Sequence, residues 1–168
     1  KWPADQAAIL YSLWLYDQYF ETNLSQTPIE GWFSYMDEQA VHQETGLYIT
    51  EVMNVKKFSK VPRGCALSYL SHYVGRFDPE RGQRIWDKYK QAFLKKTIIG
   101  TGFREYPEDF KYRWTPDSGP IVLGLGAAAT GIGLNAASTL GDTQTYNQLE
   151  KTLDRVQSGF FGLEKLVG

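Results

Sequence analysis

The sequence predicts an all-α protein built from three helical hairpins, each with one buried and one exposed helix. Two observations lead to this fold class. Pro3, Pro62 and Pro120 lie 59 and 58 residues apart, and each opens a long apolar stretch with few or no charges. Each stretch is followed by a segment whose apolar residues recur at helical spacing. We expect hairpins over about 3–41, 62–97 and 120–158, within a single domain spanning residues 1–168.

The second helix of each hairpin has a recognisable start. Thr27 and Glu30 form a capping-box pattern with Pro28 at the first helical position. Asp78 precedes Pro79 at the next such start, and Asp142 can cap the third. Apolar residues then occupy one face only, so each of these helices should have a solvent-exposed side.

The first helix of each hairpin has a different composition. Between Ala7 and Phe20 the only charged residue is Asp17, and the segments 64–75 and 118–141 contain no formal charge. A helix that is apolar on every side is usually buried on every side. Buried and exposed helices should therefore alternate along the chain.

The predicted loops are unequal in length. Links from a buried to an exposed helix are short, whereas the links in the other direction span about 42–61 and 98–119. Short turns between paired helices place all of these turns at one end of a bundle. The long loops should then gather at the other end, over the N-termini of the buried helices, where a functional site is expected.

This organisation resembles the α/α-toroids of the six-hairpin glycosidase-like superfamily, which include linalool dehydratase/isomerase-like proteins. The strings Pro62-Arg63-Gly64-Cys65 and Asp117-Ser118-Gly119-Pro120 look like inner-helix starts of that group. The resemblance implies a partial α/α toroid with a funnel-shaped site at the inner-helix N-termini, and a carbohydrate-active glycoside hydrolase or isomerase. Three hairpins correspond to about half a toroid, so it also implies a missing second half, a partner chain or self-association.

The loop before the third hairpin concentrates carboxylates, guanidinium groups and aromatic rings. Sugar sites use flat rings against the apolar sugar faces and carboxyl groups for acid/base chemistry. Glu105 and Asp117 are the first candidates for such a pair, and Asp5, Arg63 and Asp117 hold equivalent places in the three repeats. The predicted catalytic residues are Glu105, Asp117 and Asp5, and the predicted substrate-binding residues are Arg63, Arg104, Tyr48, Tyr106 and Trp114.

Structural alternatives stay open for these residues. Arg104, Glu105 and Arg113 can form a salt-bridge network that only pins the loop. Asp5 and Asp117 suit the starts of helices, where a carboxylate is stabilised by free N–H groups. The cleft can equally belong to a non-catalytic ligand-binding module, and the repeat to a helical scaffold for protein interaction.

Other classes of function find little support in the sequence. A net charge of −1 gives no electrostatic case for nucleic acid. One cysteine and two histidines argue against a metal site, and no cofactor is predicted. Residues 124–129 match a dinucleotide fingerprint, but no parallel strand follows them. The uncharged 118–141 segment is rich in small residues, which favours close helix packing over membrane spanning. Cys65 is expected to be buried and structural, with activation by a helix N-terminus as the alternative.

Overall fold

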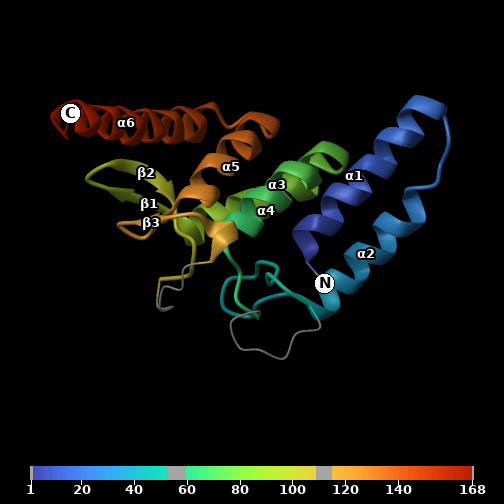
Figure 1. The fold of residues 1–168 in the computed structure, drawn as a ribbon. Coiled ribbons are helices and arrows are strands. Elements are labelled where there is room, and N and C mark those ends of the chain that lie inside the picture. Colours follow the sequence, from blue (N-terminus) through green and yellow to red (C-terminus); the bar gives the residue numbers. More distant parts are fainter. Residues whose placement is uncertain (1, 53–59, 109–114, 168) are drawn as a thin grey trace.

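Six α-helices and two short β-hairpins form the part of the chain that a computed structural model describes, residues 2–52, 60–108 and 115–167 (Figure 1). The helices pair in chain order, α1 (Pro3–Phe20) with α2 (Gln26–Gln39), α3 (Gly64–Phe77) with α4 (Pro79–Phe93), and α5 (Ala127–Thr139) with α6 (Thr143–Val167). The predicted all-α class is confirmed, with three helical hairpins at its core.

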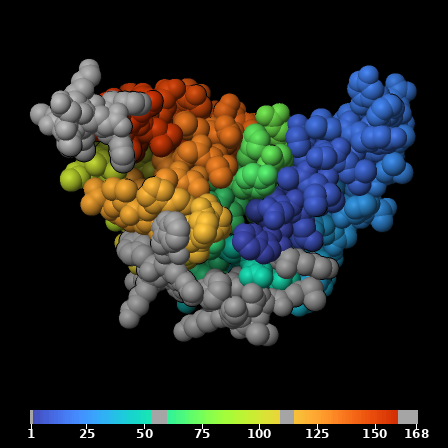
Figure 2. Space-filling view, viewed as in Figure 1, coloured from blue at the N-terminus to red at the C-terminus, as the bar shows by residue number. Residues whose placement is uncertain are grey.

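The first helices of the three hairpins form a central row. α3 packs against both α1 and α5, and the three run in the same direction, with their N-termini at one end (Figure 1). α2 contacts α1, α4 contacts α3 and α6 contacts α5. Figure 2 shows α1 in blue, α3 in green and α5 in orange side by side on one face. In the described part of the chain, no helix is long and apolar enough to cross a membrane.

The third hairpin begins differently from the prediction. A helix from Pro120 is wrong, because β3 (Ile121–Val122) and β4 (Leu125–Gly126) form an antiparallel pair and α5 begins only at Ala127. Leu123 and Gly124 between them have φ values of 52° and 85°. Two positive φ values are the signature of the tight turn that joins antiparallel strands. An α-helix cannot continue through this turn.

The second long loop also contains a hairpin that the sequence analysis did not predict. β1 (Leu94–Thr97) continues directly from α4 and pairs antiparallel with β2 (Gly100–Phe103). A bridge between Arg104 and Leu125 then joins the end of β2 to β4. Together these contacts carry the chain from the end of α4 back to the N-terminus of α3, where the predicted site residues lie. The short 3-10 helix η2 (Pro116–Ser118) follows on the same side.

Two of the three predicted helix caps are confirmed, whereas the Thr27–Glu30 capping box is wrong, because α2 begins at Gln26 with Ser25 as its N-cap residue. The Asp78 carboxylate accepts a hydrogen bond from Arg81 N at 2.9 Å, and Asp142 accepts one from Thr145 N at 3.0 Å. Asp17 has a related role that the sequence analysis missed. Its carboxylate accepts hydrogen bonds from the backbone N–H groups of Leu24 and Ser25, which form the turn into α2. Asp17 therefore orders the connection between α1 and α2.

The core divides into two clusters on either side of α3. One gathers the aromatic rings of α4 and β2 with α5 and α6, and the other joins α1, α2 and the first long loop to α3. In the first cluster, the rings of Tyr89 and Phe103 stack with centroids 4.2 Å apart. α3 contributes to both clusters, through Leu67 to the first and through Leu70 and Val74 to the second. It is the helix that holds the hairpins together.

The predicted burial of α1 on every side is wrong. Several large apolar side chains of this helix are exposed, with Ile9 at 67%, Tyr19 at 81% and Phe20 at 56% of their full accessibility. Their spacing places them along one face of the helix. We define the α1 stripe as Trp2, Ile9, Tyr16, Tyr19 and Phe20. α3 packs against three helices, α1, α4 and α5, whereas α1 packs closely against only α2 and α3 within the described residues. The stripe therefore lies on a less enclosed helix at the end of the row.

Candidate functional site

The candidate site is built at the N-terminus of α3. Arg63 is the N-cap residue and has extended backbone geometry, so the helix begins at Gly64. The Gly64 N–H donates to the carbonyl of Glu105 at 2.9 Å. A Cβ at position 64 would lie 2.0 Å from the carbonyl oxygen of Arg104. Glycine is required here because the segment after β2 passes directly over the start of α3.

Glu105 is completely buried against this helix start. Its Oε1 lies 2.9 Å from Arg63 Nε and 2.8 Å from Arg63 Nη2. The Cys65 thiol donates to the same oxygen at 3.1 Å, and the Cys65 N–H donates to Oε2 at 3.2 Å. Within the described residues, Arg63 and Cys65 together donate hydrogen bonds to both oxygens of this carboxylate, as a buried anion needs.

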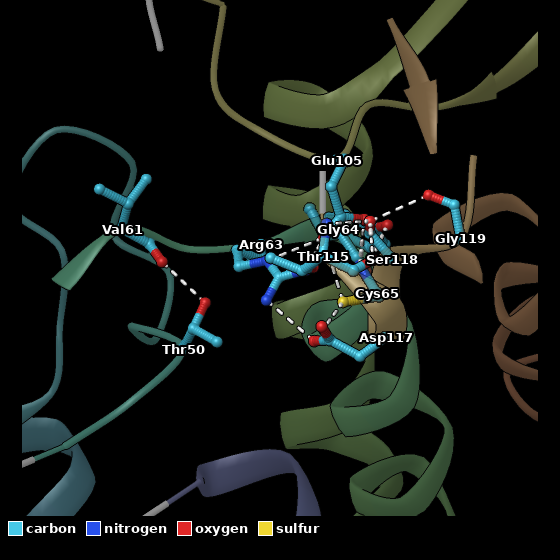
Figure 3. Close-up of polar contacts among 11 residues, drawn as sticks. Thr50, Val61, Arg63, Gly64, Cys65, Glu105, Thr115, Asp117, Ser118 and Gly119 are labelled. Carbon is cyan, nitrogen blue, oxygen red and sulfur yellow. Dashed lines mark hydrogen bonds and ion pairs between the residues drawn. The ribbon is translucent and has the colours of Figure 1, made fainter. Parts of the chain in front are cut away.

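Arg63 extends the network toward the surface (Figure 3). Its Nη1 lies 2.9 Å from Oδ2 of Asp117, and its Nη2 donates to Thr115 Oγ1 at 2.6 Å. The guanidinium group also lies 5.6 Å from the centre of the Tyr106 ring. One buried arginine thus links the β2 end, the η2 segment and the start of α3. It fixes the position of the Asp117 carboxylate.

The two carboxyl groups that Arg63 joins differ in their electrostatics. Burial raises the pKa of Glu105, and this effect exceeds the opposing hydrogen bond from Cys65 and the charge of Arg63. Partial burial also acts to raise the pKa of Asp117, but the hydrogen bond from Thr115 and the charge of Arg63 hold it below its usual value. Asp117, whose side chain is 40% exposed, is therefore an ionised carboxylate that solvent can reach.

Cys65 lies between these groups as a neutral thiol. Burial and the neighbouring Glu105 charge raise the pKa of Cys65, despite the positive charge of Arg63. The sequence alternative of a thiolate activated by the helix N-terminus is not supported, because Glu105 occupies the N–H group that would stabilise it. The thiol acts as a hydrogen-bond donor, as expected for a structural cysteine.

A pocket of about 140 Å³ opens beside Asp117 at the N-terminal ends of α1 and α3. We call it the Asp5–Asp117 pocket, because it brings together carboxyl groups from the first hairpin and from the segment before the third. Aromatic and apolar side chains form much of the remaining wall. Its lining residues are Trp2, Ala4, Asp5, Thr50, Cys65, Ala66, Tyr69, Asp117 and Ile132.

The structure brings together only some of the predicted site residues. Asp5 and Asp117 line the pocket, and Arg63, Glu105 and Tyr106 stand behind it in the buried network. Tyr48 lies in a different pocket, between α2 and α4. The Arg104 side chain forms an ion pair with Glu108 at 2.7 Å, outside the network. Trp114 and Arg113 lie outside the described residues.

The sequence analysis missed several lining residues, of which Tyr69 and Trp2 are the most informative. Tyr69 lies one helical turn after Cys65, so its position on the same face follows from helical spacing. A hydrogen bond with Tyr73, together with burial, raises the pKa of Tyr69 to about 12, which keeps its hydroxyl neutral. Trp2 directly precedes the Pro3 helix start that the sequence did identify.

No group of three or more His, Cys, Asp or Glu side chains with metal-binding geometry occurs among the described residues. The carboxyl groups of Glu105 and Asp117 accept hydrogen bonds from Arg63, and Glu105 also accepts one from the Cys65 thiol. A scan against protein-family models gives no match, and a search of the curated proteins gives no significant match.

Proposed function

We propose that the Asp5–Asp117 pocket is the active site of a carbohydrate-active enzyme domain, a glycoside hydrolase or an isomerase. The observation that carries the proposal is that two carboxyl side chains, from Asp5 of α1 and Asp117 of η2, line one pocket together with aromatic side chains. Carboxyl pairs provide the acid and the base for sugar chemistry, and flat rings bind the apolar faces of sugars.

The proposal assigns different roles to the two acidic groups beside Arg63. Asp117 is the general base, because Arg63 and Thr115 keep it ionised and it lines the pocket. Glu105 is a positioning residue, since it is fully buried and reaches the pocket only through Arg63 and Cys65. In this proposal Glu105 has the structural role that the sequence analysis left open, because it holds the loop in place through the network.

Asp5 completes the acid/base pair from the first turn of α1. In a hydrolase, Asp5 donates a proton to the leaving oxygen while Asp117 takes one from the attacking water. In an isomerase, Asp117 transfers a proton from the hydroxyl-bearing carbon to the adjacent carbonyl carbon, while Asp5 donates a proton to the carbonyl oxygen and then accepts one from the neighbouring hydroxyl group. The isomerase scheme returns both carboxyl groups to their starting states. In the hydrolase scheme Asp117 ends protonated and Asp5 ends ionised, so proton exchange with solvent water resets the pair before the next cycle.

The small volume of the pocket suggests that part of its wall is supplied by residues outside the three hairpins. Ligand pockets usually enclose about 300–1,000 Å³, whereas this one encloses about 140 Å³. A second half of an α/α toroid, packed on the open side of the helix row, would supply the remaining walls. The toroid architecture is part of the proposal, and the exposed α1 stripe is consistent with it.

The reaction class can be tested with two substrate panels. We expect the folded protein either to release nitrophenol from at least one of a set of 4-nitrophenyl glycosides or to interconvert a free aldose and its ketose. Hydrolysis alone assigns the hydrolase, and interconversion alone assigns the isomerase. If neither panel reacts and no monosaccharide perturbs the NMR signals of residues 4, 5, 65 and 117, the proposal is wrong.

A helical scaffold for protein interaction is the second candidate function. The α1 stripe favours it, because contiguous exposed aromatic side chains commonly mark protein interaction surfaces. In this case the Asp5–Asp117 pocket would have no catalytic role and would result only from the packing around the Arg63 network. The two candidates differ in outcome, since a scaffold would have a partner on α1 and no turnover in either panel.

A further inference from the structure

A second and larger pocket lies between the outer helices of the first two hairpins. It encloses about 260 Å³, near the lower end of the range for small-molecule sites. The end of α2, the turn after it and one face of α4 form its walls. Its lining residues are Asp37, Val41, Gly46, Leu47, Tyr48, Arg81, Arg84, Ile85 and Lys88. We call it the Arg84–Lys88 pocket.

The turn that closes this pocket is held in place by backbone contacts. Val41 and Tyr48 form an antiparallel bridge, and His42 N donates to the Leu47 carbonyl at 2.8 Å. Gly46 has a φ of +62°, which glycine adopts without strain. Its carbonyl accepts a hydrogen bond from Lys88 Nζ at 3.3 Å, so the turn rests against α4.

The acidic group of the pocket is already neutralised by its neighbours. Tyr48 donates a short hydrogen bond to Asp37, and Arg81 Nη1 lies 2.7 Å from the other Asp37 oxygen. Burial and this contact raise the pKa of Tyr48 to about 12, so its hydroxyl remains a donor at neutral pH. The Arg81 guanidinium group also stacks over Phe33 at 3.9 Å. This side of the pocket is fixed and electrically balanced.

Two further cations face the pocket with weak partners. Arg84 reaches Glu80 only at 3.9 Å, and both side chains of that pair are largely exposed. Within the described part of the chain, the Lys88 ammonium group forms no ion pair, and its hydrogen bond is to the Gly46 carbonyl at 3.3 Å. Residues four apart lie on one helix face, so Arg84 and Lys88 present their charges together. The pocket therefore has an excess of positive charge, in a protein whose net charge is −1.

We propose that the Arg84–Lys88 pocket binds a small phosphomonoester. The phosphate group lies between the Arg84 guanidinium and the Lys88 ammonium groups, and the organic part lies on Val41, Leu47 and Ile85. Two weakly paired cations match the charge of a phosphate dianion, and the planar guanidinium group suits phosphate oxygens. This site is separate from the Asp5–Asp117 pocket and does not depend on the proposed enzyme activity.

The test is isothermal titration calorimetry with phenyl phosphate, which combines a phosphate group with an apolar body. Phenol and inorganic phosphate serve as separate probes of the two parts. We expect the wild type to bind phenyl phosphate more tightly than either. The double variant Arg84→Gln, Lys88→Gln should lose about a hundredfold in affinity, since a hydrogen bond to a charged group is worth roughly a factor of ten. Its melting temperature should stay near that of the wild type, because both side chains lie at the rim.

A matched control removes two positive charges on other elements, with Lys96→Gln on β1 and Lys151→Gln on α6. This variant should keep the wild-type affinity, as should Asp117→Asn in the other pocket. If the control variant lost as much affinity for phenyl phosphate as the double variant, the binding would be non-specific charge attraction and the proposal would be overturned. So would phenol binding as tightly as phenyl phosphate, a double variant with unchanged affinity, or no binding by the wild type.

Discussion

Arg63 and Glu105 form a buried ion pair in which two nitrogens of the guanidinium group lie 2.8 and 2.9 Å from one carboxylate oxygen. The two residues are 42 positions apart in the chain. Their contact fixes the loop after β2 on the N-terminus of α3, and the same arginine holds Asp117 at the edge of the pocket. The geometry of the proposed site therefore depends on a buried ion pair that lies behind the pocket.

Glu105→Gln should destabilise the protein strongly. The substitution leaves the Arg63 charge buried without its main partner, and breaking a buried pair in this way costs about 3–5 kcal/mol. The free energy of unfolding in urea measures the effect. Glu108→Gln is the matched control, because Glu108 is exposed and pairs with Arg104 at the surface, and its effect should stay within about 0.5 kcal/mol. Similar values for the two variants would refute the structural role of Glu105.

Two glycines in helices should respond oppositely to alanine. Gly64→Ala places a Cβ 2.0 Å from the Arg104 carbonyl oxygen, and the forced movement should cost about 1–3 kcal/mol. Gly31, within α2, has no atom within 4 Å of such a Cβ. Gly31→Ala should therefore stabilise the protein by up to about 1 kcal/mol through helix propensity. Thermal unfolding of both variants checks this contrast, and a neutral Gly64→Ala would disprove the close approach.

Acid should weaken the contact between α4 and the start of α6. Partial burial acts to raise the pKa of Asp142, but hydrogen bonds from Lys90, Thr145 and Trp86 outweigh it and hold the pKa well below its usual value. A lowered carboxyl pKa contributes stability that is present above the unfolded-state pKa and is lost as the pH falls. We expect unfolding free energies measured between about pH 6 and pH 2 to fall less steeply in Asp142→Asn than in the wild type.

The control for the acid experiment is Asp154→Asn on the exposed side of α6. Asp154 has no hydrogen bond or ion pair to other described residues. At neutral pH its substitution should change stability by no more than about 0.5 kcal/mol, whereas Asp142→Asn should cost more. Parallel pH curves for the wild type and Asp142→Asn would contradict the proposed linkage.

The α1 stripe should cause self-association of the isolated chain. Tyr16→Ser combined with Phe20→Ser removes two exposed rings that contact each other at 4.5 Å, and the sedimentation coefficient should shift toward that of a monomer. Ile98→Ser is the control, because Ile98 is 92% exposed at the β1–β2 turn. A wild type that sediments as a monomer at high concentration would argue against an interaction surface on α1.

Much of the fold could be predicted because its helices carry local signals. Pro3, Asp78 and Asp142 mark helix starts through backbone chemistry that needs no tertiary context. Pro120 gave the same signal, but a tight turn at Leu123 and Gly124 and the bridge to Arg104 divert the chain into a hairpin. That outcome depends on pairing between distant segments, which the local sequence does not encode.

The candidate site could be predicted only in part for the same reason. Asp5, Arg63, Glu105 and Asp117 are brought to one end of the row, as repeat equivalence and loop length suggested. Sequence spacing could not show that Glu105 is buried behind Arg63 while Asp117 is exposed. Nor could it place Tyr48 with Arg81 in another pocket, because that contact depends on how α2 and α4 pack.

The most direct test of the central claim is the kcat/KM of Asp117→Asn on whichever panel substrate reacts fastest. Arg63 remains paired with Glu105 in this variant, so the free energy of unfolding should change by only about 1 kcal/mol. Loss of a general base typically costs a factor of about 10²–10⁴, and we expect a loss in that range, with a similar loss in Asp5→Asn. A kcat/KM within threefold of the wild type would contradict the account. So would a loss of activity that merely follows the fraction of unfolded protein.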